Sequence, residues 1–174
     1  MEKRLRLILA ILSIVALTGC DLATKVIARE RLEGGPPISF VPGFWDWKYA
    51  ENRDVGFSLL RFIPHDFRQP VIFTLVVLGI VAIGVYASRR LHLTRALAGA
   101  VLILSGALGN LIDRAMHGFV TDFIHWFYRD FSWPIFNVAD VCVVIGVGLL
   151  MLHEWSGPVL EPPTGEPLPG GGSA

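Results

Sequence analysis

A net charge of either sign is missing from this sequence, and charged residues of any kind are scarce. Lys and Arg together number 15, Asp and Glu also number 15, and charged residues make up 17% of the 174 positions. Because there is no basic surplus, the composition gives no indication of nucleic-acid binding. Hydrophobic residues make up 53% of the chain, and the mean hydropathy is +0.55. This balance is typical of a small polytopic membrane protein rather than a soluble domain.

Residues that bind metals or form disulfides are also few. The two cysteines, Cys20 and Cys142, lie far apart inside apolar runs, and we interpret each as a small packing residue. The five histidines are scattered, and His153-Glu154 lacks the second histidine at helical spacing that a zinc protease needs. We therefore predict neither a metal site nor a cofactor.

Four apolar segments are long enough to be considered as membrane spans. A spanning helix needs about 20 residues, and residues 69–88 and 96–112 approach that length without a charge. The first and last segments are shorter, and they reach it only if they include Asp21 and Asp140. We therefore expect spans at about residues 7–27, 69–88, 94–112 and 134–154.

Basic residues set the expected orientation of these spans. They cluster before the first span and between the second and third, as Lys3, Arg4, Arg6, Arg89, Arg90 and Arg95. By the positive-inside rule both flanks are cytoplasmic, and so are both termini. Six polar residues then gather at the opposite membrane face: Asp21, Asn110, Asp113, Asp122, Asn137 and Asp140. A carboxylate at membrane depth is costly, so this face is the candidate functional site.

The segment 28–68 is the largest extramembrane region. Pro42 and Gly43 interrupt an aromatic stretch within it, which favours short β-strands or hairpins. Residues 59–67 are expected to form a short interfacial helix, and the Pro/Gly-rich residues 156–174 a disordered cytoplasmic tail. The predicted fold is an all-α membrane protein with four transmembrane helices and a small β-rich loop region, in one domain covering residues 1–155.

Asp122 and Asp140 are candidates for a paired-carboxylate site, because neither has a basic residue within one helical turn. Two carboxylates with little water around them cannot both ionise, so they share a proton. The ionised partner can then take a proton from water while the neutral one polarises a carbonyl, which is peptide-hydrolysing chemistry. The alternative is a structural network in which Asp113 pairs with Arg114, Asp21 pairs with Lys25, and Asp122 caps a turn.

Four motifs carry a resemblance to a known family. They are Asp21-Leu22-Ala23-Thr24-Lys25, Gly106-Ala107-Leu108-Gly109-Asn110-Leu111-Ile112-Asp113-Arg114, Val120-Thr121-Asp122-Phe123-Ile124 and Phe136-Asn137-Val138-Ala139-Asp140. In order and spacing, over about residues 8–155, the chain resembles the lipoprotein signal peptidase (signal peptidase II) family.

The resemblance implies a multi-pass aspartyl endopeptidase of the bacterial inner membrane, with its active site near the periplasmic face. Its substrates would be diacylglyceryl-modified prolipoproteins in the membrane lipid, cleaved just before the lipidated cysteine, and globomycin-type cyclic peptides would inhibit it. The implied catalytic pair is Asp122 and Asp140. The residues that would bind substrate or support the site are Asp21, Lys25, Asn52, Asn110, Asp113, Arg114 and Asn137.

One motif departs from the family pattern. Asn52 and Phe57 match an outer-loop segment, but Asp54 stands where the family commonly has glycine. Glycine allows positive φ or close backbone approach, and Asp tolerates positive φ better than most residues. The departure leaves the role of this loop open.

Two other classes of protein remain as alternatives. Leu17-Thr18-Gly19-Cys20 reads as a lipobox after a basic start and an apolar run, so the chain could be a lipoprotein anchored through Cys20. Membrane aspartates also occur in proton-coupled transporters, although the inverted repeats of such proteins are not apparent here.

Overall fold

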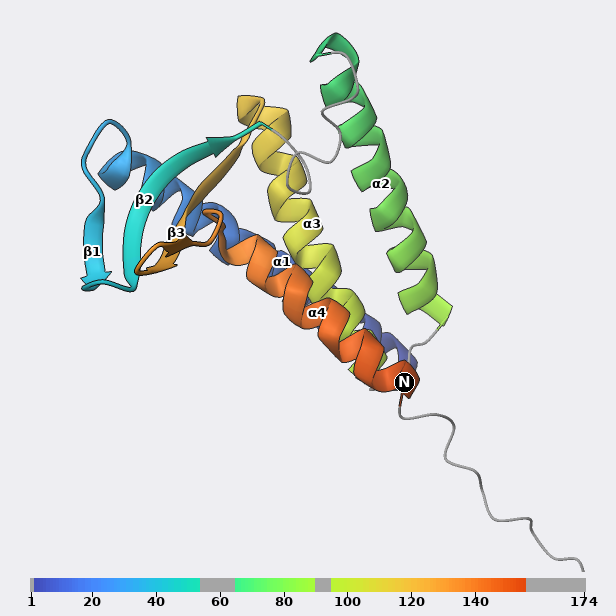
Figure 1. Cartoon of the computed structure of the whole chain (residues 1–174). Coiled ribbons are helices and arrows are strands. Elements are labelled where there is room, and N and C mark those ends of the chain that lie inside the picture. The colour runs from blue at the N-terminus through green and yellow to red at the C-terminus, as the bar shows by residue number, and fades with distance from the viewer. Residues whose placement is uncertain (1, 54–64, 90–94, 156–174) are drawn as a thin grey trace, which may run out of the picture.

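The computed structural model describes residues 2–53, 65–89 and 95–155. A bundle of helices forms the body of the molecule, and a small sheet lies at the end away from the N-terminus (Figure 1). In chain order the elements are α1 (Glu2–Leu32), β1 (Ile38–Val41), β2 (Trp45–Asn52), α2 (His65–Arg89), α3 (Arg95–His117), β3 (Val120–Tyr128), β4 (Phe131–Ser132) and α4 (Val138–Trp155). The expectation of a mostly helical chain with a small β-region is confirmed.

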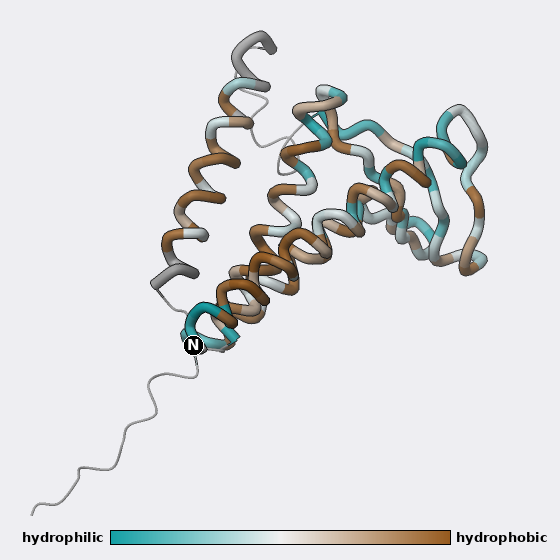
Figure 2. The backbone as a smooth tube through the Cα atoms, turned by 180° about the vertical axis from the view of Figure 1, so that it is seen from behind, coloured by the Kyte–Doolittle hydropathy of each residue, from teal (hydrophilic) through white to brown (hydrophobic). Residues whose placement is uncertain are grey.

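Three helices in the described ranges are long and apolar enough to cross a membrane. They are α1, α3 and α4, whereas α2 contributes a shorter apolar stretch, Phe73–Val85. Hydrophobic residues line the helices and hydrophilic ones concentrate toward the sheet and the N-terminal end (Figure 2). The fourth span therefore stays a prediction. The expected interfacial helix at 59–67 falls largely, and Asp54 and the tail fall wholly, outside the described residues.

The helix boundaries differ from the expected spans for local reasons. Helix α1 continues to Leu32, because no proline interrupts it, and it ends just before Gly34, which has a φ of 71° that suits glycine. Helix α4 begins at Val138 rather than near residue 134. The preceding Phe136 forms an antiparallel bridge with Ile124, with N–O distances of 2.8 and 3.0 Å, so its backbone is held by the sheet.

Small residues allow α3 and α4 to pack closely. A Cβ added at Gly99 would lie 2.7 Å from the carbonyl oxygen of Gly146, which is too close for any larger side chain. Further along α3, Gly106 packs in the same way against the backbone of Ala139. Such small-residue contacts are typical of membrane helix pairs. They bring the polar end of α3 against the start of α4.

The antiparallel sheet has the strand order β1-β2-β3-β4. As Pro42 and Gly43 indicated, the chain turns between β1 and β2, where Gly43 has a φ of 78°. Strand β3 was not anticipated from the sequence, and it carries Asp122. In the β2–β3 pairing Ala50 lies opposite Asp122 and Asn52 opposite Val120. Asn52 and Asp122 are therefore diagonal neighbours on one face of the sheet.

An apolar cluster fixes the sheet against the end of α1. Its buried members are Ala28 and Leu32 from α1 and Phe123 and Ile124 from β3. The ring of Trp47 stacks on Phe123 with centroids 6.0 Å apart. This packing determines where β3, and with it Asp122, lies relative to the helices.

Candidate active site

Asp122 is a buried carboxylate held by two asparagine amides. The residue is 2% exposed and lies near the start of β3. Asn52 Nδ2 donates to Oδ2 at 2.9 Å, and Asn137 Nδ2 donates to Oδ1 at 2.6 Å. The strand register brings Asn52 to this position, and the bridge at Phe136 brings Asn137.

Asp140 lies in the first turn of α4 and is held by a reciprocal cap. Asn137 Oδ1 accepts a hydrogen bond from the Asp140 backbone N–H at 3.1 Å, and Asp140 Oδ2 accepts one from the Asn137 N–H at 3.1 Å. This is the arrangement of a capping box, with Asn137 at the N-cap and Asp140 three residues later. From α3, Asn110 Nδ2 donates to Asp140 Oδ1 at 2.9 Å.

Asn137 connects the two carboxylates that the sequence paired. It reaches Asp122 with its side chain and Asp140 with its backbone N–H. The pKa of Asp122 is raised from its ordinary value of 3.8 to about 6. Burial is the largest cause, and the negative charge of Asp140 is the second. Asp122 therefore exchanges its proton near neutral pH and responds to the charge of Asp140.

The orientation of both amides follows from their other contacts. Lys25 Nζ donates to Asn110 Oδ1 at 2.7 Å, and because an ammonium has no acceptor, the Asn110 NH₂ must face Asp140. In the same way, Asn137 Oδ1 accepts from a backbone N–H, so its NH₂ must face Asp122. Each carboxylate therefore accepts a hydrogen bond from an amide NH₂ group and does not face an amide oxygen.

Asp21 and Lys25 support this arrangement from α1. Lys25 is 0% exposed and pairs with Asp21 Oδ2 at 2.8 Å, as the structural alternative expected. Asp21 Oδ1 accepts a hydrogen bond from the Ala139 N–H at 2.8 Å, at the start of α4. The absence of a side chain at Gly109 leaves room for the Asp21 carboxylate. The pair therefore connects α1, α3 and α4 directly behind Asn110 and Asp140.

Asp113 binds partners that the sequence analysis did not identify. Its Oδ1 lies 2.9 Å from Arg29 Nη1 and 3.0 Å from His117 Nδ1. Its Oδ2 accepts a hydrogen bond from the Thr121 N–H at 2.7 Å, next to Asp122 in the chain. The ion pairs described for Asp113 are with Arg29, His117 and, at 4.0 Å, Lys25, whereas the sequence analysis had considered Arg114 as its partner. Consecutive residues on a helix point in different directions, and the arginine that meets Asp113 comes from α1.

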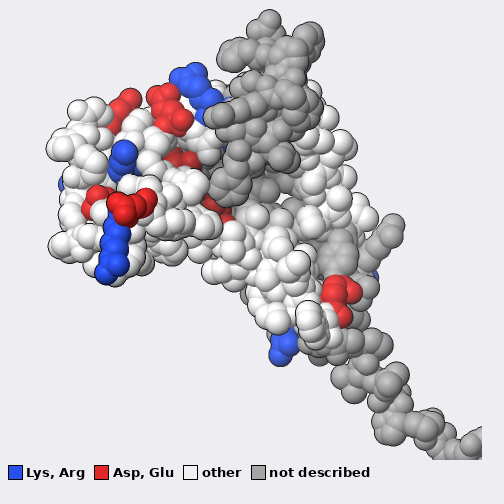
Figure 3. All heavy atoms as spheres, viewed as in Figure 1, with Lys and Arg blue, Asp and Glu red and all other residues white. Residues whose placement is uncertain are grey.

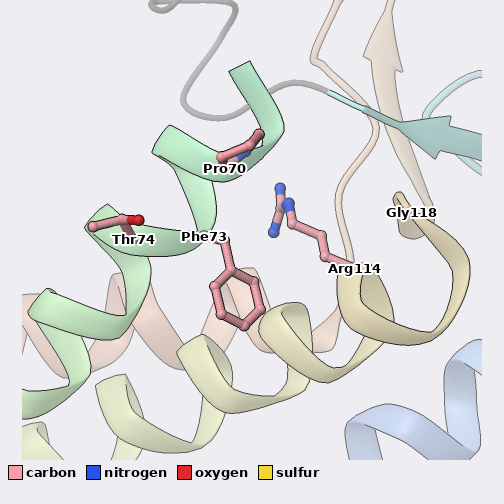
Figure 4. A pocket seen from close by; sticks show the side chains of 5 residues that line it. All are labelled: Pro70, Phe73, Thr74, Arg114 and Gly118. Carbon is pink, nitrogen blue, oxygen red and sulfur yellow. The ribbon is translucent and has the colours of Figure 1, made fainter. Parts of the chain in front are cut away.

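Arg114 projects from α3 into a cavity of about 430 Å³ beside α2. The guanidinium lies near Pro70, and Phe73 points from α2 toward α3 (Figure 4). Arg114 Nη1 also donates to the backbone oxygen of Asn110 at 3.3 Å. The cavity is therefore apolar on its α2 side and cationic beside the Asn110 segment.

Arg29, His117 and Thr121 were missed by the sequence analysis. For Arg29 a signal was present, since Asp21, Lys25 and Arg29 recur every four residues and so share one helix face. Thr121 carries no such signal, because its role depends on the pairing of β3. Among the described residues, no group of three or more His, Cys, Asp or Glu side chains is placed to hold a metal ion.

The distribution of charge separates a polar end from an apolar body. Acidic and basic side chains gather over the sheet and reappear near the opposite tip, with a largely uncharged surface between them (Figure 3). Apolar helices with buried, hydrogen-bonded carboxylates at one end define a membrane protein with an enzyme-like polar site.

The chain belongs to the signal peptidase II family. The family described as "Signal peptidase (SPase) II" matches residues 13–156. The lipoprotein signal peptidase of Symbiobacterium thermophilum is 38% identical over 149 residues, covering 86% of this chain and 93% of that protein. The one from Solibacter usitatus is 41% identical over 133 residues, covering 76% and 81%. The resemblance found in the sequence is thus confirmed.

Solved structures agree with this assignment. A bacterial membrane enzyme determined by the in meso method aligns with a TM-score of 0.76 and 26% identity, covering 90% of this chain and 93% of that one. A second such enzyme aligns with a TM-score of 0.73 and 27% identity, covering 85% and 93%. The chain therefore shares the fold of bacterial membrane enzymes along most of its length.

Proposed function

We propose that this protein is an aspartic endopeptidase that removes signal peptides from diacylglyceryl-modified prolipoproteins, cutting just before the lipidated cysteine. Family membership supports the substrate class. The observation that carries the mechanism is the hydrogen bonding of one residue, Asn137, to both Asp122 and Asp140.

In this mechanism Asp122 and Asp140 share one proton. The protonated carboxyl donates a hydrogen bond to the scissile carbonyl, and the ionised one accepts a proton from the attacking water. The oxygen of that water adds to the carbonyl carbon. Collapse of the tetrahedral intermediate returns a proton to the leaving amine and restores the pair. The raised pKa of Asp122 supports proton sharing near neutral pH.

The remaining polar residues position this pair. Asn52, Asn110 and Asn137 donate to the two carboxylates and fix their orientation. Asp21, Lys25 and Asp113 connect α1 to α3, α4 and β3 and so hold the asparagines and the strand in place.

The cavity at Arg114 is the proposed entrance for the substrate. It opens between α2 and α3, where Phe73 and Pro70 offer an apolar wall and Arg114 offers hydrogen-bond donors for a peptide carbonyl. A lipid-modified peptide entering here would keep its acyl chains in the bilayer. Asn52, on the facing strand, is the second proposed contact with the substrate backbone.

We place the protein in the bacterial inner membrane with four spans, α2 being the fourth, and with both termini cytoplasmic. The sheet and the candidate site then lie at the periplasmic end. In support, they lie at the end of α1 away from the N-terminus (Figure 1). The lipoprotein alternative fits less well, because Thr18 in the lipobox-like segment is helical and donates to the Ser105 oxygen at 3.2 Å.

The test is cleavage of a purified, lipid-modified prolipoprotein by the purified chain, with and without globomycin. We expect cleavage immediately before the lipidated cysteine, inhibition by globomycin, and no product from an unmodified precursor. Cleavage of the unmodified precursor at an equal rate would contradict the proposed substrate class. Loss of activity with a chelator, restored by zinc, would contradict the aspartic mechanism.

A further inference from the structure

A second cavity lies outside the candidate active site, where the end of α1 meets the outer part of the sheet. Its volume is about 360 Å³, and its walls are mainly apolar. Ile27, Ala28 and Leu32 line it from α1, and Trp47 and Phe123 line it from β2 and β3. We call this cavity the α1–sheet groove. None of the hydrogen bonds described for Asp122 or Asp140 involves these side chains.

One cation stands at this groove. Arg31 lines it from α1, and its side chain makes no hydrogen bond or ion pair with the described part of the chain. Arg29, on a different face of the same turn, is engaged by Asp113 and Thr121. The groove therefore combines an apolar channel with an arginine whose donors are available to an anion.

The depth of the groove follows from helix geometry. The apolar part of α1 begins at Leu7, and an untilted helix crosses about 30 Å of hydrocarbon in about 20 residues, which reaches Ile27. Arg31 then lies about 6 Å further out, within a headgroup layer about 5–7 Å thick. Ile27 is at the level of the acyl chains, and Arg31 is at the level of the phosphates.

We propose that the α1–sheet groove binds one anionic phospholipid of the surrounding leaflet. An acyl chain lies along Ile27, Ala28 and Trp47, and the phosphate accepts hydrogen bonds from the Arg31 guanidinium. Arginine suits this role because its planar fork matches phosphate oxygens. Ile27 is 56% exposed, so the groove continues onto the lipid-facing surface of α1 and a lipid can enter it sideways.

This site depends on insertion in a membrane and not on peptidase activity. The lipid would hold α1 against β2 and β3 through residues other than the buried polar ones. Its occupancy can therefore be measured without a prolipoprotein, and failure of the cleavage test would leave it unaffected.

The experiment is native mass spectrometry of the purified full chain, titrated with phosphatidylglycerol or with a diacylglycerol that has the same acyl chains. Two variants alter the groove, Arg31→Gln and Ile27→Asn. Their matched controls are Arg129→Gln, another exposed arginine, and Val26→Asn, a 44% exposed neighbour of Ile27 that does not line the groove. All four altered side chains are exposed, so folding should be retained.

We expect one phosphatidylglycerol to be retained by the unaltered chain and by both controls. Arg31→Gln should weaken this binding about tenfold, because a charge-assisted hydrogen bond to phosphate is lost. It should leave diacylglycerol binding unchanged. Ile27→Asn should weaken both lipids. Equal retention of phosphatidylglycerol by Arg31→Gln and Arg129→Gln would overturn the proposal.

A second readout locates the lipid. Phosphatidylglycerol with brominated acyl chains should quench tryptophan emission, and the quenched fraction should fall in Trp47→Phe. Quenching that is the same in Trp47→Phe and in the unaltered chain would place the retained lipid elsewhere and overturn the assignment to this groove.

Discussion

The guanidinium of Arg29 on α1 is 2.9 Å from the carboxylate of Asp113 on α3. The same nitrogen donates to Thr121 Oγ1 at 2.6 Å, and the Thr121 N–H donates to Asp113 at 2.7 Å. One ion pair thus joins two helices to the backbone of β3 at the residue before Asp122. Because Asp113 is fully buried, its charge depends on these partners.

Replacing Arg29 should therefore destabilise the protein and disturb Asp122. Arg29→Met leaves the buried Asp113 carboxylate with less positive charge around it. Removing one partner of a buried ion pair usually lowers the free energy of unfolding by about 3–5 kcal/mol. Lys25 and His117 remain near Asp113, so we expect the lower end of that range. Thermal unfolding in detergent measures the effect. Arg129→Met, at an exposed arginine outside this network, is the control, and an equal midpoint in the two variants would contradict the assignment.

The sequence was sufficient to predict which polar residues come together, but not how they contact one another. The apolar segments and their charged flanks determine which ends of the helices meet, so counting spans was enough to group Asp21, Asn110 and Asp140 at one face. The capping box of Asn137 and Asp140 was not anticipated, because the last span was expected to begin near residue 134 and so to include both residues.

Other features depend on contacts between distant residues. Strand β3 forms because Ala50 and Asn52 pair with it and Phe136 bridges to it, and neither pairing leaves a local pattern in residues 120–128. The pairing of Arg29 with Asp113 depends on which helix packs against α3. Periodicity places each arginine on a face of its helix, but it does not identify the helix that the face meets.

The proposed catalytic pair makes a prediction about additivity. Asp122→Asn and Asp140→Asn should each reduce cleavage by about 10²–10⁴-fold or more, since each removes a proton-transfer group. Because the two carboxylates act as a unit, the double variant should be scarcely worse than either single one. Turnover of the prolipoprotein at equal folded fraction tests this. Near-normal activity in either single variant would exclude the pair.

Asp122→Asn should also change how stability depends on pH. The pKa of Asp122 in the folded protein is raised from 3.8 to about 6, so this group stabilises the fold below pH 3.8 and the stability is lost as pH rises through about 6. An asparagine does not titrate. Between pH 4 and pH 7, the free energy of unfolding of the variant should thus rise by up to about 3 kcal/mol relative to that of the unaltered protein. Chemical unfolding at the two pH values measures the gain, and a constant difference would mean that Asp122 is not perturbed.

Gly109 provides a test of the support behind the site. A methyl group at this position would collide with the Asp21 carboxylate, which cannot move without giving up Lys25 or the Ala139 N–H. Gly109→Ala should therefore lower both stability and turnover, with stability falling by about 1–3 kcal/mol as for other overpacked sites. Gly148→Ala on α4 is the control, because nothing lies within 4 Å of a Cβ there. Similar unfolding midpoints for the two variants would show that Asp21 has room to move.

Asn52 should set the pH range in which the pair works. Its amide donates to Asp122 Oδ2 at 2.9 Å and so favours the ionised carboxylate, which lowers the pKa of Asp122 against the raising effect of burial. If the working form holds one shared proton, kcat/KM should fall as pH rises through the pKa of Asp122. Asn52→Ala removes the hydrogen bond, so the pKa should rise by about one unit and the falling limb should move to higher pH.

Lys48→Ala, at an exposed position of the same strand, is the control and should leave the limb in place. A lower kcat/KM with an unmoved limb would limit Asn52 to substrate contact, whereas a limb displaced to lower pH would contradict the proposed sharing of the proton.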